Sequence, residues 1–277
     1  MRFLIFLGVI GSLASGGWYA WENLGPVRQF VHTRLPTSEY RTLEIRYAAE
    51  EIMEAHKEQL LKNQGYKFLE PKILFYPYLL MDVKYAQSQG ATSEGILLWG
   101  LHDGEMVIHT ASWEKTHGFE DCLIAHAEKN DFKILEALVE QGGAMDREKM
   151  YDRFKVEPEV VDRWIESCRS KKLVVISGNK FRLHFQKPKM LIDPITRFDQ
   201  PLVTQPATYS NRINGRYSPS QIKKLAQIAF GNDFVVRRTQ EVFLPVYSIA
   251  IQNPDGSTLT TFWNALNGEQ LDSASCR

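Results

Sequence analysis

The chain has 277 residues, 44% of them hydrophobic, which is enough for about two domains with buried cores. Its 33 basic and 33 acidic residues give a formal net charge of zero. A dedicated nucleic-acid-binding protein usually carries a positive excess, because phosphate neutralisation supplies much of its affinity, so any basic surface here must be local. Cys122, Cys168 and Cys276 are widely separated and odd in number, which excludes a disulfide framework.

The chain begins with an apolar run at residues 3–21. It fits either a signal peptide, with small residues for cleavage at 12–14, or a membrane anchor of about the minimum spanning length. We favour the anchor, because Trp18 and Trp21 continue the run past the cleavage position and aromatic residues suit the membrane interface. We therefore assign residues 1–24 to a signal peptide or anchor. The short N-terminal tail favours a soluble part outside the cytoplasm, with the cytoplasmic side as the alternative.

Helical spacing of apolar residues predicts an amphipathic helix at residues 43–61. Strand-like patterns follow at residues 72–85 and 95–101. We therefore expect residues 38–120 to form a small α+β domain in which a helix packs on an antiparallel sheet.

A polar cluster near the end of this segment includes three possible zinc ligands, His117, Cys122 and His126, of which the last two lie one helical turn apart. Their spacing matches no zinc signature, and a cysteine in such a segment is more often a small buried apolar residue. We therefore expect no metal and no other cofactor, and these three residues remain secondary candidates.

The next segment shows three helical patterns followed by two strands. Asn130 is expected to cap a helix at residues 131–141, and Asp146 to cap a second helix that runs through Phe154. Pro158 starts the third helix. The buried stripe of this third helix is expected to comprise Val161, Trp164, Ile165 and Cys168.

Residues 172–176 and 181–185 alternate as strands around a hairpin turn at residues 177–180. Three short helices followed by a β-hairpin is the order found in winged-helix domains, so the chain resembles the winged-helix superfamily over about residues 130–187. We place this domain at residues 121–187. The resemblance implies a binding surface on the third helix and the wing, and the candidate residues there are Arg163, Arg169, Lys171, Lys172, Lys180 and Arg182.

The third helix of such a domain would enter the major groove if the domain bound DNA. Its outward positions include Glu159, Asp162 and Glu166, and an acidic helix fits poorly into a groove lined by phosphates. We therefore favour a protein partner over DNA.

Residues 188–216 contain four prolines and few periodic apolar positions, which predicts an extended linker. A helix is then expected at residues 218–230, followed by strands at 234–238, 246–252 and 258–263. These elements predict a second small α+β domain at residues 217–277.

The two α+β segments share short sequence patterns. Phe75-Tyr76-Pro77 corresponds to Phe243-Leu244-Pro245, and in both segments a tryptophan, Trp99 or Trp263, is followed after four residues by Gly-Glu. The second segment resembles a PepSY-type domain over about residues 218–271. That resemblance implies a binding or inhibitory module outside the cytoplasm.

Catalytic motifs are absent from the sequence: it has no glycine-rich phosphate loop, no Gly-x-Ser-x-Gly elbow and no His-Glu-x-x-His. We therefore expect a non-enzymatic, membrane-anchored or exported binding or adaptor protein, whose winged helix contacts an envelope or membrane protein. The alternative is a membrane-tethered winged-helix transcription regulator that binds DNA.

Overall fold

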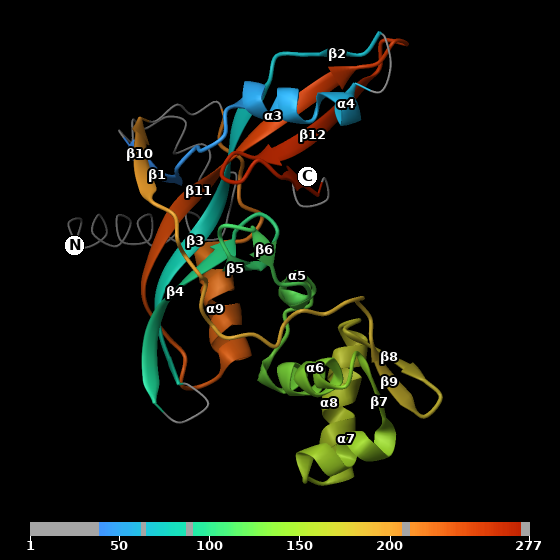
Figure 1. Ribbon diagram of the computed structural model, residues 1–277. Coiled ribbons are helices and arrows are strands. Elements are labelled where there is room, and N and C mark those ends of the chain that lie inside the picture. Colours follow the sequence, from blue (N-terminus) through green and yellow to red (C-terminus); the bar gives the residue numbers. More distant parts are fainter. Residues whose placement is uncertain (1–38, 62–64, 87–90, 207–210, 273–277) are drawn as a thin grey trace, which may run out of the picture.

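The computed structural model describes residues 39–61, 65–86, 91–206 and 211–272 (Figure 1). With 28% helix and 37% strand, it confirms the predicted α+β class. The anchor or signal peptide predicted at residues 1–24 lies outside the described residues. Among the helices of the described ranges, none is long and apolar enough to cross a membrane.

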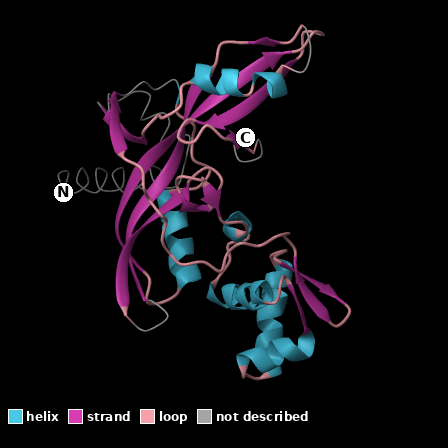
Figure 2. Cartoon of the chain, viewed as in Figure 1, coloured by secondary structure: helices cyan, strands magenta, loops and turns pink. Residues whose placement is uncertain are grey.

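A large, mostly antiparallel sheet forms the body of the molecule (Figure 2). Seven of the strands described follow the order β10 (Leu202–Pro206), β1 (Glu39–Leu43), β11 (Val235–Gln252), β3 (Lys72–Ala86), β4 (Thr92–Gly100), β5 (Met106–His109) and β6 (Glu114–Lys115). The sheet is extended by β12 (Thr258–Asn264) and β2 (Lys67–Phe68), which pair with β11, and by β13 (Gln270–Leu271), which pairs with β12.

The two longest strands, β3 and β11, run antiparallel through the middle of this sheet. β11 is one strand of 18 residues, so the prediction of separate strands at residues 234–238 and 246–252 is wrong. Pro245 suggested a break, because proline cannot donate a ladder hydrogen bond. It lies where the partner of β11 changes from β3 to β12, and the strand continues through it.

The pairing of β3 with β11 is symmetric. The tripeptides Phe75-Tyr76-Pro77 and Phe243-Leu244-Pro245 lie antiparallel to each other, so that Tyr76 faces Leu244 and each proline faces the other segment's phenylalanine. The two short patterns that match in the sequence therefore meet at the centre of one sheet.

The hairpins that follow are also equivalent. β4 folds back on the second half of β3 and then pairs with β5, whereas β12 folds back on the second half of β11 and then pairs with β13. In the turns, the Gly100 N–H donates to the Glu105 carbonyl and the Asn264 N–H donates to the Glu269 carbonyl, both at 2.9 Å. The two tryptophan-containing turns thus share their backbone hydrogen bonds as well as their sequence pattern.

The first segment has two short helices, α3 (Ala49–Ala55) and α4 (Lys57–Leu60), instead of the single helix predicted at residues 43–61. The prediction started too early, because Leu43 still belongs to β1, where the hydroxyl of the preceding Thr42 donates to the Phe243 carbonyl at 2.9 Å. The helix predicted in the second segment is confirmed as α9 (Pro219–Phe230), with Ser218 as its N-cap.

Each of these helices packs on the hairpin of the other segment. Tyr217, just before α9, donates its N–H to the Leu101 carbonyl at 2.9 Å, and Tyr47, just before α3, donates to the Ala265 carbonyl at 3.0 Å. Leu101 and Ala265 occupy the same position in their respective turns. Two intertwined halves therefore build the sheet, and neither half is continuous in sequence.

Between β6 and β10 the chain forms an insert with its own small sheet (Figure 1). The described helices of the insert are α5 (Phe119–Ile124), α6 (Lys129–Glu140), α7 (Arg147–Phe154) and α8 (Pro158–Ser170). Its strands β7 (Ala144–Asp146), β9 (Lys180–Leu183) and β8 (Val174–Ser177) pair antiparallel in that order.

The third predicted helix is confirmed as α8, and its stripe faces inward: Val161, Ile165 and Cys168 are buried and Trp164 is half-buried. The N-cap predicted at Asn130 is wrong, because α6 starts at Lys129 and its N-cap is Glu128, two residues earlier. The buried side chains of the insert belong to the same hydrophobic cluster as those of α9 and the first hairpin. The insert is therefore fixed to the sheet through a continuous core.

The exchange of helices can be tested with two equivalent isoleucines, Ile52 in α3 and Ile222 in α9, which are 2% and 0% exposed. We expect each Ile→Ala substitution to lower the free energy of unfolding by about 2–4 kcal/mol, because each leaves a cavity against the opposite hairpin. Ile124→Ala, at a site 60% exposed, serves as the control and should change it by less than about 0.5 kcal/mol. The measurement is urea unfolding; a small effect at Ile52 alone would contradict the equivalence.

Candidate functional site

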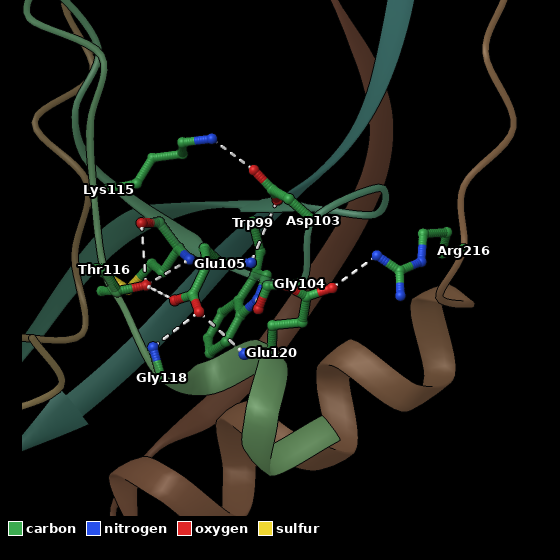
Figure 3. Close-up of polar contacts among 10 residues, drawn as sticks. Trp99, Asp103, Gly104, Glu105, Lys115, Thr116, Gly118, Glu120 and Arg216 are labelled. Atoms are coloured by element: carbon green, nitrogen blue, oxygen red, sulfur yellow. Dashed lines mark hydrogen bonds and ion pairs between the residues drawn. The ribbon is translucent and has the colours of Figure 1, made fainter. Parts of the chain in front are cut away.

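A polar cavity of about 230 Å³ lies beside the first tryptophan turn. It is formed where the turn between β4 and β5, β6, α5, the residue before Tyr217 and the residue after β13 come together, and Figure 3 shows most of its polar contacts. Its lining residues are His102, Asp103, Glu105, Lys115, Thr116, His117, Glu120, Asp121, Arg216 and Asp272.

Glu105 is the centre of this site. One carboxylate oxygen accepts the backbone N–H groups of Gly118 and Glu120 at 2.8 and 3.0 Å, and the other accepts the Thr116 hydroxyl at 2.6 Å (Figure 3). Burial raises the pKa of the Glu105 carboxyl above its ordinary value, and the Asp103 carboxylate adds to this, while the three hydrogen bonds act in the opposite direction. The carboxylate joins the turn, β6 and the start of α5.

Ion pairs surround this carboxylate. The Lys115 ammonium lies 2.6 Å from Asp103, and the Arg216 guanidinium lies 2.7 Å from Glu120 (Figure 3). The Tyr217 hydroxyl also donates to Glu120, at 3.2 Å. These groups are paired with one another across four segments of the chain, so their clearest role is to fix the insert and α9 to the first hairpin.

The three secondary metal candidates do not converge. His117 lines the cavity, but Cys122 is 0% exposed and packs in the hydrophobic core, where burial raises the pKa of its thiol well above the ordinary value. His126 follows α5 in a left-handed conformation with φ of 50°. In the described part of the chain, no group of three or more His, Cys, Asp or Glu side chains is arranged to hold a metal ion.

The six candidate binding residues of the insert have different surroundings. Lys171 is engaged by Asp131 at 2.6 Å and holds the end of α8 to the start of α6. Arg169 pairs with Glu166 at 3.4 Å, and Lys180 lies 3.8 Å from Asp146. The three others, Arg163, Lys172 and Arg182, are exposed.

Of these six residues, Lys180 and Arg182 are brought together most clearly. They are two positions apart on β9 and therefore project from the same face of the small sheet. Arg163 and Arg169 lie on the exposed part of α8, interleaved with Glu159, Asp162 and Glu166. The geometry thus separates a small basic face of β9 from a face of α8 with mixed charge.

The sequence analysis missed Asp103, Glu105 and Arg216 as members of a site. The signal for Glu105 was its place in the repeated Gly-Glu turn. The signal for Arg216 was a second repeat that went unnoticed: Arg46-Tyr47 precedes α3 as Arg216-Tyr217 precedes α9.

In comparisons with known proteins, no protein-family model, no curated protein and no solved structure matches the chain.

The role of Glu105 as an anchor can be tested against its equivalent, Glu269, which is exposed. We expect Glu105→Ala to lower the free energy of unfolding by about 2–4 kcal/mol, since it leaves buried N–H groups without an acceptor. Glu269→Ala should cost less than about 0.5 kcal/mol. Denaturant unfolding of both variants makes the comparison, and equal costs would show that Glu105 is not an anchor.

A second prediction concerns Asp131, which is 1% exposed. Although burial opposes it, hydrogen bonds from Lys171, Ser167 and the Glu128 N–H lower the pKa of Asp131. A lowered pKa stabilises the fold above the unfolded-state value, and this stabilisation is lost as the pH falls through the folded-state value. Wild-type protein should therefore lose more stability on acidification below about pH 5 than Asp131→Asn does.

The measurement is the urea midpoint at a series of pH values for wild type, Asp131→Asn and Lys171→Met. The Lys171→Met variant keeps the carboxylate but removes the ammonium that lowers its folded-state pKa, so this variant should lose less stability on acidification than wild type does. Parallel pH curves for wild type and Asp131→Asn would contradict the assignment.

Proposed function

We propose that this chain is a non-enzymatic binding or adaptor protein, held at a membrane by residues 3–21, in which the insert is a winged-helix module that contacts a protein partner. Support for the winged-helix assignment comes from the order of α6, α7 and α8 and from the hairpin of β8 and β9, with β7 as a third strand. The two halves of the large sheet serve in this proposal as PepSY-like modules that carry the insert.

The observation that carries the proposal is the exposed face of α8. It presents Glu159, Asp162 and Glu166 beside Arg163 and Arg169. A row of DNA phosphates would be repelled by the three carboxylates, whereas a protein surface with alternating charges can complement both signs. The face also offers backbone rigidity, because the opposite side of α8 is buried in the core.

The polar cavity around Glu105 supports the non-enzymatic part of the proposal. Three of its carboxylates, Asp103, Glu105 and Glu120, are engaged in hydrogen bonds and ion pairs, and Glu105 accepts three donors. A general base must instead keep a lone pair directed at a substrate proton. The arrangement favours a structural role for these groups.

A DNA-binding function is the second candidate. It is favoured by the exposed wing residues Lys172, Lys180 and Arg182, which could approach phosphates beside a groove. The proposed topology, with the soluble part outside the cytoplasm, disfavours this alternative.

Site-specific photo-crosslinking tests the proposal in the full chain in its native membranes. The photoreactive residue is placed at Arg163 or Glu166 on α8, and at Glu50 on α3 as the control. We expect a discrete protein adduct, identified by mass spectrometry, from both α8 positions and none from Glu50. Exchanging the charges in Glu159→Arg/Arg163→Glu, with photoreactive Glu166, should lower the yield about tenfold while net charge stays constant.

The DNA alternative is tested by mixing the purified full chain with a short DNA duplex at low salt. A salt-sensitive mobility shift that is lost in Lys180→Gln/Arg182→Gln, together with the absence of a protein adduct from α8, would replace the adaptor function by DNA binding.

A further inference from the structure

The outer edge of β12 is open in the structure. β12 pairs with β11 over its whole length, but its contact with β13 is confined to Phe262 and Trp263. Over residues 258–261, no other strand of the described chain lies on the outer side of β12.

The backbone of Thr260 points toward this open edge. On the far side of β11, Leu69 donates its N–H to the Ala250 carbonyl at 2.8 Å, and Ala250 lies directly opposite Thr260. In an antiparallel pair, two facing residues either exchange hydrogen bonds or both direct their N–H and C=O groups outward. The backbone N–H and C=O of Ala250 therefore point away from β12, and those of Thr260 point away from β11.

The equivalent edge in the other half is covered. There, Ile96 of β4 occupies the position of Thr260, and its carbonyl accepts the Thr196 N–H at 2.7 Å. The Thr196 hydroxyl bridges the Leu98 N–H and the Val107 carbonyl, at 2.8 and 2.6 Å. A piece of the chain between β9 and β10 thus adds to the edge of β4 as a short strap.

The edge of β12 also lacks the usual protection against strand addition. Natural proteins place charges or prolines on open edge strands to prevent pairing with other chains. Thr258, Leu259 and Thr260 are exposed, uncharged and suited to β structure, and Leu259 is 50% exposed.

We propose that the β12 edge at residues 258–260 binds an extended segment of a partner protein by strand addition. The segment exchanges backbone hydrogen bonds with Thr260, packs an apolar side chain against Leu259 and is uncharged where it faces the edge. The strap around Thr196 shows what such a segment can look like, because it binds the equivalent edge of β4 and its central residue is β-branched. This surface is separate from α8, so the proposal stands or falls independently of the winged-helix module.

The probe is a capped, fluorescent peptide with the sequence of residues 192–198 of this chain, because the corresponding segment already fits the equivalent edge. Its binding to the full chain is followed by fluorescence anisotropy, and a scrambled peptide controls for composition. Hydrogen exchange should slow in the segment 257–262 on binding, because the outward N–H groups there become bonded.

Two variants block the edge in different ways. Thr260→Pro removes the outward N–H, and Thr260→Lys keeps the backbone but adds a charge to the edge. Both should bind the probe at least about tenfold more weakly: Thr260→Pro because an interfacial hydrogen bond is lost, and Thr260→Lys because its ammonium must be accommodated beside an uncharged strand. Thr92→Lys, at an exposed position of β4, is the matched control and should bind like wild type.

Undiminished binding of the probe by Thr260→Lys, with a wild-type unfolding curve, would overturn the proposal. It would also fail if the probe bound only after residues 273–277 were deleted, because the chain's own tail would then be the occupant. A dimer that forms without the probe and is lost in Thr260→Lys would assign the edge to a second copy of the chain and overturn it as well.

Discussion

The antiparallel pairing of β3 with β11 is the constraint on which the rest of the structure depends. These strands come from segments more than 150 residues apart, for example Tyr76 opposite Leu244, so closing this pair carries a large loop-closure entropy cost. The cost is offset because each strand is long enough to serve both halves of the sheet. Once β3 and β11 pair, the positions of the two hairpins and of the helices α3 and α9 are determined. The insert then lies at one end of the sheet (Figure 1).

The exchange of helices follows from the same pairing. α3 and α4 lead into β2, which pairs with the second half of β11 at Ile251 and Gln252, so α3 is delivered to the hairpin of β11 and β12. α9 is delivered to the opposite hairpin by the same geometry, where Phe230 packs against Trp99. Separating the halves would expose both hairpins, so the two halves are expected to fold as one cooperative unit.

Local elements were predictable from the sequence where a local signal determined them. Pro158 and the spacing of Val161, Ile165 and Cys168 were sufficient to define α8, and the Gly-Glu turns marked both hairpins. The prediction failed where distant pairing decides the outcome. No local pattern around Thr42 shows that it joins a strand beside Phe243, and the continuity of β11 depends on a change of partner at Pro245.

The candidate site was hidden for a related reason. Its residues come from four separate segments, and a turn glutamate such as Glu105 looks like a solvent-exposed residue until α5 is placed over it. The sequence resemblance between the two turns also concealed their difference. Glu269 accepts from Asn267 at 2.9 Å on the surface, whereas Glu105 is half-buried and accepts the N–H groups at the start of α5.

The difference between the two halves indicates how the fold is used. The half that contains β4 has its turn covered by α5 and its edge covered by the strap around Thr196, both of which belong to the inserted region or its return path. Among the residues that the structure describes, the half that contains β12 has neither covering, and its turn residue Glu269 and its edge residue Thr260 are exposed. Because the two halves share backbone geometry, the coverings of the first are a physical guide to what the exposed surfaces of the second can accept: an extended strand at the edge, and an N–H donor at the turn.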